Sequence, residues 1–445
     1  MKQHLNGNAV TPPRRGRAIA GAAILASAMA LAGCADGTDT DTGASGEITL
    51  TLSAWNLESS PEFQAIVDGF EEKYPDVTVE LAEYDLTNYN KLITADVAAG
   101  TAPDIITQNQ VQYVPVFQEA GQLLDVSDVS LPEGIRGADS YKIDGVAYAT
   151  PYRMDTWVLF YNKDLLDLAG VEYPDGSWTW DDYADVATEL TAKLTAAGST
   201  AKGTYLHSWQ SLVQGFATAQ APGADMFSAD YEYFEPFYES ALALQDSGVQ
   251  ESFNTITANQ LNYRGVFGSQ QAALLPMGSW YYGILLQQQV SGEAQDFNWA
   301  VAPAPQLDAS TAGTDNTPLT FGDPTGFGIN ANIDESKIQA AKEFLEYASS
   351  EDAAIALAKI GVLPAYVDDD VLNAYFSTDG APADELTKFA LQTGDVAPQN
   401  PPVAETAAVQ NILNDMHTAI MSESESVDSA IKAAEDRVKN EVGVD

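Results

Sequence analysis

The hydrophobic positions from residue 48 onward alternate between two periods. Ile48–Ala54 is a β-rich run, and after a polar break the apolar residues of Pro61–Tyr74 recur at helical spacing, at Phe63, Ile66, Val67, Phe70 and Tyr74. A strand, a helix and a short buried strand follow at Val77–Leu81, Tyr89–Ala99 and Pro103–Ile106. This alternation predicts an α/β fold with a mainly parallel sheet, helices on both faces and a ligand site at the carboxyl ends of the strands.

The remainder of the chain continues the mixture of strands and helices, with a middle part that is dense in aromatic residues. The polar segment Pro151–Asp155 reads as a break between two strands. The predicted elements are strands at Gly145–Thr150, Trp157–Asn162 and Gly326–Asn330, and helices at Trp180–Ala197, Ser336–Ala348, Glu351–Lys359, Glu405–Met421 and Ser426–Glu441. With 445 residues, this pattern is long enough for two or three domains.

The first 33 residues have the pattern of a signal peptide rather than of a folded segment. Four basic residues precede an apolar stretch, Ala18–Ala32, of about 15 residues, which is shorter than the roughly 20 needed to cross a bilayer. The stretch ends in Leu31–Cys34 (LAGC), which resembles a bacterial lipobox. The resemblance implies that Cys34 is lipidated and anchors an exported protein to the outer face of the cytoplasmic membrane; a chance cysteine after an ordinary signal peptide is the alternative.

Residues 34–46 contain mainly Gly, Ser, Thr and Asp, a composition typical of a flexible tether. The aspartates in this segment lack the glycine and the terminal glutamate of a calcium-binding loop, so we interpret them as part of a solvated linker. The whole chain carries 64 acidic and 20 basic residues, a formal net charge of −44. This sign argues against nucleic acid or an anionic membrane surface as a partner, because phosphate binding requires a basic patch.

Few residues are suited to metal or nucleophilic chemistry. Only His207 and His417 remain after the signal peptide, no second cysteine is present, and neither histidine has a metalloprotease spacing. No phosphate-binding loop, dinucleotide fingerprint or nucleophile elbow occurs. Tyr281 and Tyr282 would be iron ligands only in a basic or histidine-rich setting. Pairs of carboxylates are too numerous to exclude, so a secreted lipid-anchored glycosidase remains an alternative.

Aromatic and polar residues gather in the breaks after predicted strands. Sugars have apolar faces and hydroxyl rims, so their sites combine flat aromatic rings with side chains that donate and accept hydrogen bonds in fixed geometry. The sequence therefore predicts a carbohydrate site in these breaks. The residues concerned are Trp55 and Asn56, Gln108 and Asn109, Arg153 and Asp155, and Trp280 and Tyr281.

Over nearly all of the chain after the tether, the sequence resembles the extracellular solute-binding proteins of ABC importers, in the family-1 carbohydrate group. The resemblance rests on the order and spacing of many short segments. They include ITLTLSAWN at 48–56, LITADVAAGTAPDII at 92–106, VAYATPYRMDTWVLFYNKDLLDLAGV at 146–171, FGSQQAALLPMGSW at 267–280 and GVLPAY at 361–366. It implies two lobes joined by a hinge, no enzymatic activity, no cofactor or metal, and delivery of the ligand to the permease subunits of the importer. Monomer is the default state.

The resemblance also implies that each lobe is discontinuous in sequence. The expected N-terminal lobe comprises residues 47–156 and 301–364, and the expected C-terminal lobe comprises residues 157–300 and 365–445. The three crossings are expected near Thr156–Val158, Val301–Pro305 and Pro364–Ala365.

The ligand contacts follow from the same comparison. Trp280 matches the stacking position, Trp209 the wall of the second lobe, and Arg153 and Asp155 the polar edge beside the hinge. Weaker matches are Asp323, Phe327 and Glu405, and the loop after the first strand contributes Asn56, Glu58 and Ser59. Maltose binders of the family often carry a tryptophan and a charged residue where this chain has Gln108 and Asn109. A polyol, a glycerol phosphodiester and an amino-sugar remain alternative ligands.

Overall fold

The computed structural model describes residues 48–58 and 60–443. The signal peptide, the tether, Cys34 and Ser59 therefore lie outside the described residues. Within the described ranges, no helix is both long enough and apolar enough to cross a membrane.

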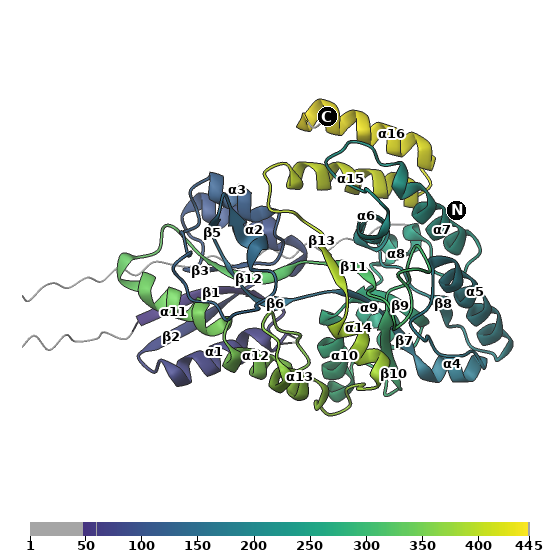
Figure 1. Cartoon of the computed structure of the whole chain (residues 1–445), viewed down its shortest axis with the longest axis horizontal. Helices are drawn as coiled ribbons and strands as arrows, with labels where there is room; N and C mark the ends of the chain where they lie inside the picture. The colour runs from purple at the N-terminus through teal and green to yellow at the C-terminus, as the bar shows by residue number, and fades with distance from the viewer. Residues whose placement is uncertain (1–47, 59, 444–445) are drawn as a thin grey trace, which may run out of the picture. The chain divides into compact units, whose positions relative to one another are not determined.

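The first sheet contains five strands in the order β2-β1-β3-β12-β6 (Figure 1). Strand β1 pairs in parallel with β2 and β3, whereas β12 is antiparallel to both β3 and β6. Figure 1 shows helices α2 and α3 on one side of this sheet and α1, α11 and α12 on the other. The bounds are β1 (Ile48–Trp55), β2 (Val77–Tyr84), β3 (Ile105–Gln108), β6 (Thr150–Met154), β12 (Pro324–Ile329), α1 (Glu62–Lys73), α2 (Tyr89–Ala99), α3 (Tyr113–Glu119), α11 (Ile338–Ala348) and α12 (Glu351–Ala358).

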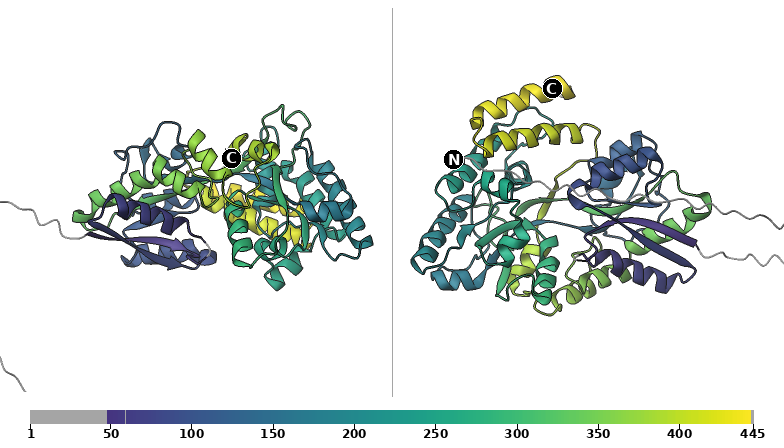
Figure 2. Two further views of the ribbon diagram at one scale, coloured as in Figure 1. Left: turned by 90° about the horizontal axis from the view of Figure 1, so that it is seen from below. Right: turned by 180° about the vertical axis from the view of Figure 1, so that it is seen from behind.

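The second sheet contains four strands in the order β10-β7-β9-β8, and only the pair β8 and β9 is parallel. Figures 1 and 2 show helices α15 and α16 side by side at the C-terminal end of the chain. The bounds are β7 (Trp157–Asn162), β8 (Lys202–Thr204), β9 (Ala272–Gly278), β10 (Trp299–Pro303), α4 (Lys163–Ala169), α5 (Trp180–Ala196), α6 (Phe216–Gln220), α7 (Glu235–Asp246), α8 (Phe253–Asn259), α9 (Tyr263–Gly268), α10 (Trp280–Ser291), α13 (Asp369–Phe376), α14 (Glu385–Gln392), α15 (Thr406–Met421) and α16 (Val427–Arg437).

Two further pairs of strands and several single turns of helix complete the described fold. Strands β4 and β5 form a hairpin, and β11 pairs in parallel with β13. The bounds are β4 (Lys142–Ile143), β5 (Val146–Ala147), β11 (Leu319–Gly322), β13 (Asp395–Pro398), η1 (Leu86–Asn88), η2 (Ala138–Tyr141), η3 (Ser211–Gly215), η4 (Glu232–Phe234), η5 (Glu335–Lys337) and η6 (Val438–Val442).

Each sheet has its own hydrophobic core. The first core joins β1, β3 and β12 to the apolar face of α1, whose Phe63, Ile66 and Phe70 have no exposed surface. Burying side chains of this size contributes about 1.5–3 kcal/mol each, which explains why the helical spacing in the sequence is a reliable signal. The second core gathers around β7 and β9, and both strands are buried along their whole length.

The α/β class is confirmed, but the sheets are mixed rather than mainly parallel. Within the first sheet, parallel pairing occurs where a strand is followed by a helix that leads to the next strand, as in β1, α1 and β2. Strands β6 and β12 lie where the chain passes from one sheet to the other, and they run against β3 or each other. Pro151–Met154, expected to be a break, belongs to β6 for the same reason.

Three short segments connect the two sheets. The first is Asp155–Thr156, between β6 and β7, and the second is Asp323, between β11 and β12. The third lies at Pro364–Ala365, where the Ala365 amide donates to the Tyr152 carbonyl at 3.0 Å. The first two pass so closely that a side chain at Gly322 would lie 2.0 Å from the Asp155 carbonyl oxygen.

The return to the first sheet comes later in the chain than the sequence predicts. The prediction places it near Val301–Pro305, but Trp299–Pro303 forms the buried strand β10, which pairs with β7 of the second sheet. Phe321 still packs in the second core, and Phe327 is the next large residue to pack in the first. Because an apolar strand is stabilised by burial against its neighbours, the chain stays with the second core until Asp323.

Candidate functional site

Two tryptophans predicted from the sequence lie next to each other. The ring centroids of Trp209 and Trp280 are 6.4 Å apart at 51°. Trp209 is 40% exposed and Trp280 is half-buried. Trp280 also packs edge-on against Trp157, with centroids 5.3 Å apart. Two indole rings that keep exposed surface form an apolar platform of the kind on which a sugar ring stacks.

The position of Trp280 depends on the end of strand β9. Trp280 is the first residue of α10, and its ring lies back over Gly278, where an added Cβ would be 1.9 Å from a ring carbon. Glycine is therefore required at this position for the ring to lie there. The pattern Gly-Ser-Trp after an apolar strand is the sequence signal for this geometry.

Two other aromatic side chains lie beside Trp209. The His207 ring lies 4.5 Å from the Trp209 ring and the Tyr263 ring lies 5.7 Å from it. Burial lowers the pKa of His207 to about 4, so the imidazole is neutral at pH 7. Its Nδ1 is 3.0 Å from the Tyr205 hydroxyl. His207 and Tyr263 were not among the predicted site residues, because neither lies in a break after a predicted strand.

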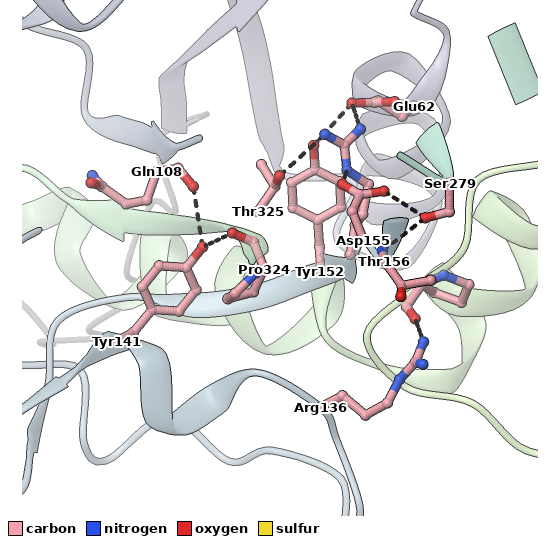
Figure 3. Close-up of polar contacts among 12 residues, drawn as sticks. Glu62, Gln108, Arg136, Tyr141, Tyr152, Asp155, Thr156, Ser279, Pro324 and Thr325 are labelled. Carbon is pink, nitrogen blue, oxygen red and sulfur yellow. Dashed lines mark hydrogen bonds and ion pairs between the residues drawn. The ribbon is translucent and has the colours of Figure 1, made fainter. Parts of the chain in front are cut away.

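Arg153 forms ion pairs with Asp155 and with a third charged residue, Glu62. Figure 3 labels both carboxylates. Arg153 Nε lies 2.9 Å from Asp155 Oδ2, and Nη1 donates to Glu62 Oε1 at 2.7 Å. Nη2 donates to the Thr325 hydroxyl at 3.1 Å. The Arg153 side chain is 11% exposed, and those of Glu62 and Asp155 are each 7% exposed. These three residues form what we call the buried charge cluster.

The electrostatics of the buried charge cluster favour a charged arginine. Burial disfavours the charged guanidinium and so lowers the pKa of Arg153. The carboxylates of Asp155 and Glu62 have the larger combined effect, and they raise this pKa above its usual value. Burial raises the pKa of Asp155, while Arg153 opposes the rise.

Glu62 is missing from the predicted site because its partner Arg153 is 91 positions away. A charge beside the apolar stripe of a helix is the only signal that sequence offers for it.

The two loops expected to contact ligand from the first sheet differ in exposure. Trp55, the last residue of β1, is only 5% exposed and packs against Phe63 and Tyr89, so it belongs to the core. Asn56 is half-buried with a φ of 48°, an uncommon conformation outside glycine, and Glu58 is exposed.

Gln108, the last residue of β3, is 2% exposed, and its backbone carbonyl accepts from the Tyr141 hydroxyl at 3.1 Å. The neighbouring Asn109 is half-buried, and among the described residues its Oδ1 has no hydrogen-bond donor. This atom is a buried acceptor just after the end of β3.

Two further aromatic candidates are core residues. Tyr281 and Phe327 have no exposed surface. The Tyr281 ring packs 5.0 Å from Tyr263, and the Phe327 ring stacks on Tyr152 at 4.6 Å and 11°. The Tyr282 hydroxyl donates to the Pro382 carbonyl at 2.7 Å. Because a fully buried ring offers no face for stacking, the structure does not favour Tyr281 and Phe327 as ligand contacts.

The two remaining candidates lie at different places. Asp323 is half-buried in the second crossing, where its carboxylate accepts from the backbone amides of Gln399 and Asn400 at 3.0 and 3.2 Å. Glu405 is exposed at the start of α15. The exposed Trp209, the half-buried Trp280, Asn56 and Asn109 therefore remain as groups with free surface or a buried acceptor.

Comparison with known proteins identifies the family. Residues 54–355 match bacterial extracellular solute-binding proteins, which is more than half of the chain. The chain belongs to this family. This solute-binding protein is therefore not an enzyme, since the family members and structural neighbours are substrate-binding proteins of ABC transporters.

The relatives of this solute-binding protein match it along most of its length. The maltodextrin-binding protein MdxE of Bacillus subtilis is 23% identical over 447 residues, covering 96% of this chain and 98% of MdxE. A sugar transporter of Rhizobium etli, solved in an open conformation, is 28% identical with a TM-score of 0.73, covering 88% of this chain and 99% of that one. A Listeria monocytogenes ABC substrate-binding protein in complex with cycloalternan is 22% identical with a TM-score of 0.72, covering 90% and 100%, and shows the shared fold.

Proposed function

We propose that this protein binds a carbohydrate between two lobes and delivers it to the permease of an ABC importer. The observation that carries the proposal is the pairing of Trp209 with Trp280, whose ring centroids are 6.4 Å apart. Stacking on such rings supplies most of the affinity for a sugar, and polar side chains decide which sugar is accepted. The sugars bound by several structural neighbours support the same class of ligand.

The polar contacts would come from the first sheet. Asn56 and the buried Oδ1 of Asn109 follow strands of that sheet, and Glu58 is exposed beside Asn56. An amide offers both a donor and an acceptor to neighbouring hydroxyls. A sugar that stacks on the tryptophans and reaches these groups would bind one arrangement of the lobes more tightly than another, and so would shift the population toward it.

The buried charge cluster favours a neutral ligand. Arg153, the predicted cation beside the hinge, is already paired with two carboxylates, so it has little charge left for an anionic ligand. Neutral His207 adds no positive charge beside Trp209. These observations count against a glycerol phosphodiester and in favour of neutral sugars or polyols.

The lobes, anchor and partners complete the proposal. We assign the N-terminal lobe to the segments that build the first sheet and the C-terminal lobe to those that build the second, with crossings at Asp155–Thr156, Asp323 and Pro364–Ala365. Cys34 would hold the protein at the outer face of the cytoplasmic membrane as a monomer. There the sugar-loaded form would meet the permease subunits.

The test is a thermal-shift screen of the chain after Cys34 against neutral mono-, di- and oligosaccharides, polyols, amino-sugars and glycerol phosphodiesters. A ligand at about 100 times its dissociation constant adds about 2.7 kcal/mol of stability, which raises the melting temperature by several degrees. We expect a shift with one class of neutral sugar. A shift only with charged ligands, or none in a folded and ligand-stripped preparation, would refute the proposal. Hydrolysis of an oligosaccharide by the pure protein would instead support the glycosidase alternative.

A further inference from the structure

The buried charge cluster reaches the platform through a serine. Asp155 uses its two carboxylate oxygens in two directions, because Oδ2 pairs with Arg153 Nε at 2.9 Å and Oδ1 accepts from the Ser279 hydroxyl at 3.1 Å (Figure 3). Ser279 is fixed further by its backbone amide, which donates to the Thr156 carbonyl at 2.8 Å. It is the residue directly before Trp280, so Asp155 holds the start of α10.

The other end of the cluster lies at the start of α1, directly after the first predicted ligand loop. Glu62 is the first residue of α1, and the segment 56–61 that precedes it contains Asn56 and Glu58. Glu62 Oε1 accepts from Arg153 at 2.7 Å and from the Tyr152 hydroxyl at 3.0 Å. A series of contacts therefore runs from Glu62, at the start of α1, through Arg153 and Asp155 to Ser279, the residue before Trp280.

Burial strengthens the electrostatic contacts within the cluster. Each of the three charged side chains is at most 11% exposed, so water screens their attraction poorly. Removing one member leaves a buried charge with incomplete pairing, and its neighbours must move to compensate. Ser279 transmits such a movement, since its hydroxyl and its amide are both bonded within the first crossing.

We propose that Asp155 and Arg153 are positioning residues, which couple the start of α1, directly after the loop that follows β1, to Trp280 without touching the ligand. A change at Glu62 then alters the position of the Trp280 ring. A change at Trp280 alters the position of Glu62 in turn, because coupling between two sites is reciprocal. The consequence for sugar binding rests on the proposed function. A sugar that contacts the loop after β1 would change the position of Trp280 before it contacts that ring, and a sugar that contacts Trp280 first would likewise change the loop.

The test uses the protein without ligand, labelled with 5-fluorotryptophan at its seven tryptophans. Trp280→Phe assigns the fluorine resonance of Trp280. We expect Asp155→Asn, Ser279→Ala and Glu62→Gln each to shift that resonance by more than its line width and to leave that of Trp299 in place. The matched control is Asp104→Asn, which removes another carboxylate paired with a cation, Lys337 at 3.0 Å, and should leave the Trp280 resonance unmoved.

The decisive result comes from combining the variants. We expect Glu62→Gln to shift the Trp280 resonance in the wild-type background and to add nothing once Asp155→Asn is present. An unmoved resonance in Ser279→Ala and Glu62→Gln, or an equal shift from Glu62→Gln in both backgrounds, would overturn the proposal. If Asp155→Asn does not fold, Ser279→Ala replaces it in the same cycle. Because no ligand is present, a failure here is distinct from a failure to bind sugar.

Discussion

The carboxylate of Asp323 predicts how stability depends on pH. It lies in the crossing between β11 and β12, and accepts from the backbone amides of Gln399 and Asn400 and from the Asn400 side chain at 2.5 Å. Burial raises the pKa of Asp323 to about 7, more than these three donors lower it, and the charge of Asp155 adds to the rise.

The sign and size follow from linkage. An aspartate in the unfolded chain has a pKa of about 3.9, so the folded protein binds this proton more tightly. The stabilisation is complete below about pH 4 and is lost as the pH rises to about 7. A difference of about 3 units at 1.36 kcal/mol each gives an upper limit of about 4 kcal/mol, and we expect about half of it because the side chain keeps some contact with water.

The assay is urea unfolding of the wild type and Asp323→Asn from pH 4 to 8 at constant ionic strength. Asn cannot titrate, so the difference in unfolding free energy should move in favour of the variant by about 2 kcal/mol across this range. Asp128→Asn is the control, because a hydrogen bond from Lys342 lowers the pKa of Asp128 and places its titration below the range. A difference between Asp323→Asn and wild type that stays constant with pH would refute the reasoning.

Three further predictions concern the platform and the cluster. Trp280→Ala should weaken binding of the sugar found by the screen by about 2 kcal/mol or more in calorimetry, and an unchanged affinity would remove Trp280 from the site. Gly278→Ala should also weaken binding although every tryptophan is retained, because its Cβ would lie 1.9 Å from the Trp280 ring; Gly265→Ala, whose Cβ would meet nothing within 4 Å, should bind normally, and equal affinities would contradict the packing argument. Arg153→Met should lower the unfolding free energy measured in urea by about 3–5 kcal/mol, since Glu62 loses its cation, whereas a loss below about 1 kcal/mol would mean that the carboxylates find other partners.

Much of the fold follows from local periodicity. Helix α2 spans Tyr89–Ala99 as predicted, because its apolar face and the glycine after it are both visible in the sequence. The return at Asp323 is not visible, because the burial of Trp299–Pro303 depends on pairing with β7, about 140 positions earlier in the chain. Strand direction likewise depends on partners that are distant in sequence.

The candidate site divides along the same line. Trp280 could be predicted because Gly278 and Ser279 mark a strand-to-helix junction, whereas Tyr281 and Phe327 could not be told from core residues, since an aromatic side chain serves either purpose. Arg153 was expected to face the ligand. Its carboxylate partners come from different elements, and only the folded chain brings Glu62 to it.

The buried charge cluster also bears on how the molecule responds to ionic strength. The chain has a formal net charge of −44, so its exposed carboxylates repel one another. In 0.1 M salt, dissolved ions largely screen this repulsion between exposed charges that are more than about 10 Å apart. Ions cannot enter between Arg153 and its two carboxylates in the same way, because all three side chains are almost fully covered. In concentrated salt, the exposed carboxylates would therefore repel one another less, whereas Arg153 would stay paired with Glu62 and Asp155 as in dilute buffer.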